Sequence, residues 1–165
     1  MARSTGWLAW SRADLDAAEQ AAITAVRLQP RDGPSLLLLT GVLVERERWQ
    51  RANETATRLG DLKERSPEAL LLIGRISLEL GRWSQAKEHY EEAARRSPDD
   101  ARGQLGLALL AARQSRNWPL MQRHLRQARD IEPKFHAASL PLLRGWTVLS
   151  DDNDFLDALE EVLKH

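Results

Sequence analysis

The stretch from residue 66 to residue 98, SPEALLLIGRISLELGRWSQAKEHYEEAARRSP, decides the fold class of this chain. It predicts two helices, over 66–80 and 83–96, because apolar residues recur at helical spacing in each half. Ser66 can cap the first helix, with Pro67 at a position where its missing N–H costs nothing. Gly81 can supply the left-handed residue that ends this helix. The stretch is therefore expected to be a helical hairpin.

The same hairpin recurs along the chain with a period of about 34 residues, which is the mark of a helical repeat array. Ala18, Ala52 and Ala86 lie at equal intervals of 34 residues, and Trp49 and Trp83 keep the same interval. No segment of comparable length alternates as a strand would. We therefore expect an all-α fold with helices over residues 2–12, 14–28, 34–46, 48–59, 66–80, 83–96, 100–113, 117–130, 135–149 and 152–164.

These helices pair into hairpins over residues 1–30, 34–60, 66–98, 100–133 and 135–165. Each hairpin can bury its apolar face only against its neighbours, so we expect a single domain that spans residues 1–165. Asn117 should cap the helix that begins with Trp118 and Pro119, since proline is tolerated in a first turn. Trp49, Trp83 and Trp118 open the second helices, where an indole ring is expected to serve packing.

The composition excludes several classes of protein. Lys plus Arg and Asp plus Glu are both 24, so there is no global field that attracts nucleic acid or an anionic membrane. There is no cysteine, which excludes disulfides and thiolate metal sites. The apolar runs are far shorter than the roughly 20 residues that a membrane span needs. We expect a soluble protein without a membrane span, and favour the cytoplasm over the periplasm.

The third hairpin resembles a tetratricopeptide repeat (TPR), in which small residues, an aromatic residue and a terminal proline occupy fixed columns. The residues that carry the resemblance are Leu70, Ile73, Gly74, Gly81, Trp83, Ala86, Tyr90, Ala93 and Pro98. The resemblance implies a right-handed superhelical array of antiparallel helical hairpins, a TPR-like α-solenoid. It also implies a module that binds another protein or a peptide segment in a concave groove lined by the first helices, as a scaffold or assembly factor.

In that arrangement the groove has an apolar floor with a few arginines. The arginines could orient a ligand by pairing with its carboxylates. An alternative is that neighbouring first helices already bury much of the floor, as stacked repeats do. The expected floor residues are Leu38, Val42, Leu71, Leu78, Leu105 and Leu109, and the expected arginines are Arg75, Arg102 and Arg144.

Trp7 and Trp10 are expected at or near the concave side of the first hairpin. Tryptophan is enriched at binding hot spots, so these side chains could anchor a ligand. They could instead bury themselves against another copy of the chain and form a homodimer through the N-terminal hairpin, which is the reading we favour.

The sequence contains no evident catalytic motif, because no phosphate-binding loop, zinc-protease motif or nucleophile elbow occurs in it. We therefore expect no enzyme activity and no cofactor. His89 and His124 hold equivalent places on adjacent second helices, but a metal site would need further ligands, so we expect none. The alternative function is that of a helical repeat that binds nucleic acid. The balanced charge counts against it, because phosphate contacts should leave a basic surplus.

Overall fold

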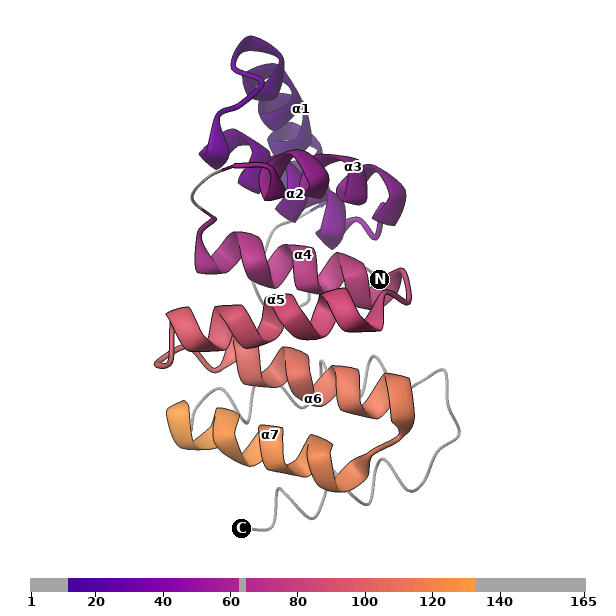
Figure 1. Cartoon of the computed structure of the whole chain (residues 1–165). Coiled ribbons are helices and arrows are strands. Elements are labelled where there is room, and N and C mark those ends of the chain that lie inside the picture. Colours follow the sequence, from indigo (N-terminus) through magenta and orange to yellow (C-terminus); the bar gives the residue numbers. More distant parts are fainter. Residues whose placement is uncertain (1–11, 63–64, 133–165) are drawn as a thin grey trace. The chain divides into compact units, whose positions relative to one another are not determined.

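The computed structural model describes residues 12–62 and 65–132, which form helices and no strand (Figure 1). Every expected helix boundary from residue 14 to residue 130 lies within two residues of the observed one. The helices expected over 2–12, 135–149 and 152–164 lie outside the described residues, apart from Arg12, which begins α1. The observed helices are α1 (Arg12–Leu28), α2 (Gly33–Glu45), α3 (Trp49–Gly60), α4 (Pro67–Glu79), α5 (Trp83–Arg96), α6 (Arg102–Ser115) and α7 (Trp118–Ile131).

The chain divides into two compact units, Met1–Arg82 and Trp83–His165. The first unit contains α1 to α4 and the second contains α5 to α7. The expected single domain and the expected superhelical path both concern how these units join, and they stay predictions.

Local capping explains where several helices begin and end. The Ser66 side chain accepts a hydrogen bond of 3.2 Å from the Ala69 N–H at the start of α4. The Asn117 side chain accepts one of 3.1 Å from the Leu120 N–H at the start of α7. Each bond satisfies a backbone donor that has no partner within the helix. Both predicted caps are thus confirmed.

The turns inside the hairpins share one backbone conformation. Gly81 has a φ of 71°, which confirms the predicted left-handed residue after α4. Glu47 and Arg116, one period before and one after it, have φ values of 54° and 48°. Residues other than glycine rarely adopt this left-handed conformation. The repeated turn is therefore maintained at Glu47 and Arg116 by the packing of the helices on either side of it.

The core of the first unit surrounds α2, which packs against α1, α3 and α4. Ala52, one of the periodic alanines, is fully buried in it, while Ala18 is half-buried. A small side chain at such a position allows close approach of the helix axes. The buried core residues are Ala22, Val26, Leu36, Leu39, Leu43, Ala52, Ala56, Leu59, Ala69 and Ile76.

The second unit is built around α6, which packs against α5 and α7. At Gly106 of α6, an added Cβ atom would be 2.3 Å from Cδ1 of the buried Tyr90 ring. At Gly103 the added atom would be 2.9 Å from the backbone nitrogen of Ala94. Glycine is therefore required at both positions by the closeness of α5 to α6.

Candidate functional site

The expected concave floor is largely interior in the described residues. Val42, Leu71 and Leu78 are 3%, 4% and 0% exposed, and Leu109 is 8% exposed. In the first unit these residues are buried because the first helices α2 and α4 pack directly against each other. Leu38 is 41% exposed, and Leu105 in the other unit is half-buried. This burial agrees with the alternative that neighbouring first helices cover much of the floor, and a binding role for these residues stays a prediction. Trp7, Trp10 and Arg144 lie outside the described residues.

Two of the expected arginines are held by contacts within the chain. The Nε atom of Arg75 lies 3.1 Å from a carboxylate oxygen of Glu79, one turn further along α4. Its guanidinium carbon lies 5.6 Å from the centroid of the half-buried Trp49 ring, which is a cation–π contact. This contact supports a packing role for Trp49.

Arg102 pairs with Asp100 just before α6. Its Nε atom lies 2.8 Å from both carboxylate oxygens, and the Arg102 backbone N–H donates a hydrogen bond of 3.0 Å. Burial by itself raises the pKa of Asp100. The bonds and the charge from Arg102 outweigh that effect, so the pKa lies below its ordinary value of 3.8. Both expected arginines thus contribute to local structure in this chain.

An open groove with a volume of about 400 Å³ lies on another part of the first unit, bordered by α1, α2 and α3. Its volume falls within the range of roughly 300–1,000 Å³ that is typical of ligand sites. The floor is mostly apolar and is formed by Ile23, Val26, Leu39, Leu43 and the buried Thr55. The rim is mostly polar and is formed by the exposed residues Arg27, Pro30, Arg51, Glu54 and Arg58.

Sequence reasoning missed this groove because it sought the binding surface on the first helices, whereas α1 and α3 are the second helices of their hairpins. A signal was present in α3, where Arg51, Glu54 and Arg58 recur at helical spacing beside the buried Thr55. Spacing of this kind is also typical of an ordinary solvated face. Only the distance between α1 and α3 in the folded chain turns that face into the side of a groove.

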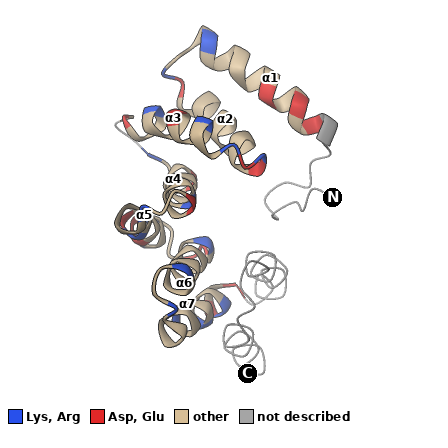
Figure 2. Ribbon diagram, turned by 90° about the vertical axis from the view of Figure 1, so that its right-hand side faces the viewer, with Lys and Arg blue, Asp and Glu red and all other residues tan. Residues whose placement is uncertain are grey.

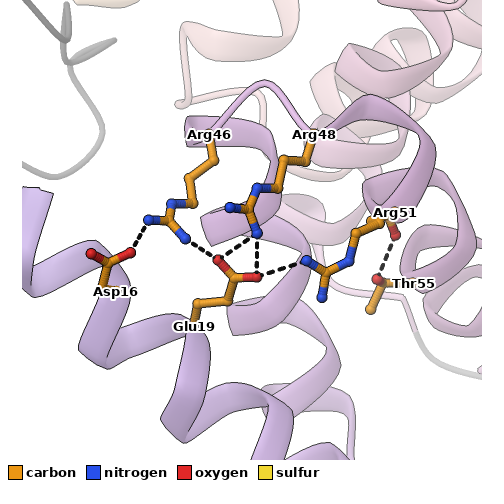
Figure 3. A network of polar contacts seen from close by, with 6 residues as sticks. All are labelled: Asp16, Glu19, Arg46, Arg48, Arg51 and Thr55. Atoms are coloured by element: carbon orange, nitrogen blue, oxygen red, sulfur yellow. Dashed lines mark hydrogen bonds and ion pairs between the residues drawn. The ribbon is translucent and has the colours of Figure 1, made fainter.

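A network of charged side chains lies next to the groove (Figure 3). Its centre is Glu19 of α1, which is only 2% exposed. Arg48 Nη1 donates to both Glu19 carboxylate oxygens at 2.8 and 3.1 Å, and Arg51 Nη1 donates to one of them at 2.9 Å. Arg46 bridges Glu19 and the exposed Asp16. Burial of this carboxylate is possible because three guanidinium groups surround it.

The network connects α1 with the turn after α2 and with the first turn of α3. Figure 2 shows the charges of α1, with acidic residues in its first half and Arg27 in its last turn. The acidic half pairs with Arg46, Arg48 and Arg51, whereas Arg27 lies at the groove rim. The charges of α1 are therefore separated along its length, and the end that borders the groove is basic.

The described residues contain no group of three or more histidine, aspartate or glutamate side chains that could hold a metal ion. His124, which was considered as a ligand, has its Nδ1 atom 2.8 Å from the Gln104 side-chain oxygen. Burial and the charge of Arg123 lower the pKa of His124 below its usual 6.5, against the opposing effects of Gln127 and Glu91. None of the helices in 12–62 and 65–132 has the length and hydropathy needed to cross a bilayer.

Comparison with known proteins agrees with this architecture. The tetratricopeptide repeat family model matches residues 71–117. No curated protein shows significant sequence similarity to the chain.

Similar solved structures include that of MamA, with a TM-score of 0.68 and 16% identity over 93% of this chain and 89% of that one. MamA 41-end from Desulfovibrio magneticus RS-1 has a TM-score of 0.66 and 20% identity over 93% and 86% of the two chains. YrrB, described as a TPR protein with an unusual peptide-binding site, has a TM-score of 0.64 and 12% identity over 92% and 78%. The chain therefore carries a tetratricopeptide repeat at residues 71–117 and has the all-α helical-repeat fold of TPR proteins.

Proposed function

We propose that this chain is a non-catalytic interaction module that binds a peptide or helical segment of a partner protein in the groove between α1 and α3. The observation that carries the proposal is the groove itself, with its apolar floor and polar rim. Apolar side chains of a ligand would leave water on this floor, while the rim would fix their orientation. The fold supports the class of function, since YrrB, one of the similar structures, is described as having a peptide-binding site.

The concave face remains the competing location for the same function. Of its expected floor residues in the first unit, Leu38 is the exposed one, while Val42, Leu71 and Leu78 are buried. A single exposed leucine is common on protein surfaces and does not form a patch. The groove brings four apolar residues together with charged side chains in one hollow, and we therefore prefer it as the binding site.

Three leucine or isoleucine substitutions separate the two locations. A peptide is first selected from a library of short random peptides on the purified protein, and its Kd is measured by fluorescence anisotropy. Ile23→Gln places an amide on the groove floor, Leu38→Gln changes the concave face, and Leu28→Gln is the matched control at a residue of α1 that is 77% exposed and outside the groove.

We expect Ile23→Gln to weaken binding by about tenfold, because a polar group would be buried without a matching partner. Leu28→Gln and Leu38→Gln should leave the Kd nearly unchanged. Circular dichroism of each variant checks that the helices are retained. Loss of binding in Leu38→Gln with normal binding in Ile23→Gln would assign the ligand to the concave face and overturn the groove proposal.

The homodimer expected through the N-terminal hairpin is examined separately. Sedimentation of wild-type protein beside a Trp7→Ala/Trp10→Ala variant should show a dimer that becomes a monomer if the N-terminal tryptophans join two copies. A monomer in both samples would contradict self-association through this hairpin.

A further inference from the structure

The rim of the groove carries an excess of positive charge. Arg27, Arg51 and Arg58 are exposed, and the acidic residue among the lining side chains is Glu54. The lining therefore has a formal excess of two positive charges around an apolar floor. A ligand that fits this surface should combine apolar side chains with carboxylates.

Arg51 and Arg58 are held at two points along the groove. Arg51 Nη1 lies 2.9 Å from Glu19 of α1, as the close-up in Figure 3 shows, and Arg58 Nη2 donates a bond of 2.7 Å to the Pro30 carbonyl oxygen. Both contacts run from α3 to α1 or to the loop that follows it. Each guanidinium carries five N–H donors, so a second acceptor can bind beside the first. The intramolecular contacts reduce the entropy that these side chains would lose on binding.

The sequence separation of the two arginines sets the spacing of their Cα atoms. Seven residues of an α-helix span about 10 Å, since the rise is about 1.5 Å per residue. Two residues of a partner that are three positions apart in a polyproline II segment, or seven apart in a helix, lie on one face and cover about the same distance. Such residues could each present a carboxylate to one guanidinium while the side chains between them contact the floor.

Building on the proposed function of this groove, we propose that its ligand is an acidic and apolar segment of a partner protein. Two carboxylates pair with Arg51 and Arg58, whose Cα atoms are about 10 Å apart along α3, and the apolar side chains between them pack on Ile23 and Leu39. Nucleic acid is a poorer fit, because phosphates would face an apolar floor and the Glu54 carboxylate.

The test is a double-mutant cycle between the protein and the peptide selected above. On the protein, Arg51→Gln/Arg58→Gln removes both charges from the rim. The matched control, Arg95→Gln/Arg126→Gln, removes the same charge from exposed positions on α5 and α7. On the peptide, glutamine replaces each acidic residue. Fluorescence anisotropy gives the Kd for each combination at low and at physiological salt.

The selected peptides should contain acidic residues three or seven positions apart around apolar ones. Arg51→Gln/Arg58→Gln should weaken their binding by about tenfold, the loss expected for two charge-assisted pairs at a partly exposed rim. The control pair should change the Kd little. The amide form of the peptide should bind wild type and the rim variant equally, because each charge then lacks its partner.

Other outcomes separate this inference from the proposed function. Peptides that bind without acidic residues, yet lose affinity in Ile23→Gln, would overturn the acidic ligand and leave the groove function intact. Peptides that are indifferent to Ile23→Gln would overturn both. A concentration-dependent dimer of the wild type that Arg51→Gln/Arg58→Gln abolishes would show that a second copy of the chain occupies the groove, and would overturn the proposed partner.

Discussion

Replacement of Gly106 by alanine is the sharpest test of the packing between α5 and α6. The new Cβ atom would lie 2.3 Å from Cδ1, 2.4 Å from Cε1 and 2.7 Å from Cγ of Tyr90. The Tyr90 side chain is buried at 3% exposure. A ring in a close-packed interior has little room to move, so the helices must separate or the ring must leave its rotamer.

The expected magnitude is the difference of two opposing effects. Overpacking of a core costs about 1–3 kcal/mol, and contacts this short with a rigid ring belong at the upper end. Alanine in place of glycine within a helix contributes about 1 kcal/mol in the other direction. Gly106→Ala should therefore lower the free energy of unfolding by about 1–2 kcal/mol.

Gly41 provides the matched control inside α2. A Cβ atom there would have Leu72 Cδ1 as its nearest neighbour, at 3.9 Å, which is an ordinary van der Waals distance. Gly41→Ala gains the helix preference without a clash, so it should raise stability by about 0.5–1 kcal/mol. Urea unfolding followed by far-ultraviolet circular dichroism measures both changes, which should differ in sign.

A second variant connects the effect to the aromatic ring. In a Tyr90→Leu background, the Gly106→Ala substitution should cost less than it does in wild type, because a smaller side chain can accommodate the added methyl group. If Gly106→Ala is as stabilising as Gly41→Ala, the Tyr90 ring does not lie over Gly106 and the described packing is wrong.

Three further predictions concern polar groups. Glu19→Ala should destabilise the protein by about 2–3 kcal/mol, because it leaves three guanidinium groups without their buried carboxylate, whereas Asp16→Ala at the exposed edge should cost about 0.5 kcal/mol or less in the same urea assay. The pKa of His124 lies below 6.5 in the folded state, so on acidification the unfolded state takes up its proton first. Stability that is present above pH 6.5 should therefore decline as the pH falls through the folded pKa. The urea midpoint of the His124→Gln variant should show a smaller decline over the same pH range. Asn117→Ala should cost about 1 kcal/mol in thermal unfolding through loss of the cap on α7, and Asn117→Asp should retain most of the stability; equal losses in the two variants would contradict a capping role.

The sequence by itself determined the helices and their repetition. The starts of α2, α4 and α7 follow from the caps Asp32, Ser66 and Asn117, since capping depends on residues within one turn of a helix end. The buried alanines Ala52 and Ala86 were also predictable, because helical periodicity and the repeat interval place them on a packed face.

Some features within the repeat were decided by packing. The left-handed turns at Glu47 and Arg116 contain no glycine that would predict them from the sequence, although Gly81 occupies the equivalent position in the turn between them. Their positions lie one repeat away from that glycine, and the flanking helices impose the conformation on residues that do not favour it.

Only the tertiary structure decided which surfaces are exposed. Val42 and Leu71 have the spacing of groove residues, yet α2 packs against α4 and both are buried. Glu19 lies in an ordinary charged stretch of sequence, and its burial depends on arginines that are 27 to 32 residues further along the chain. Helix formation is set by neighbours within about four residues, whereas exposure depends on which helices meet, and that information is spread over the whole repeat.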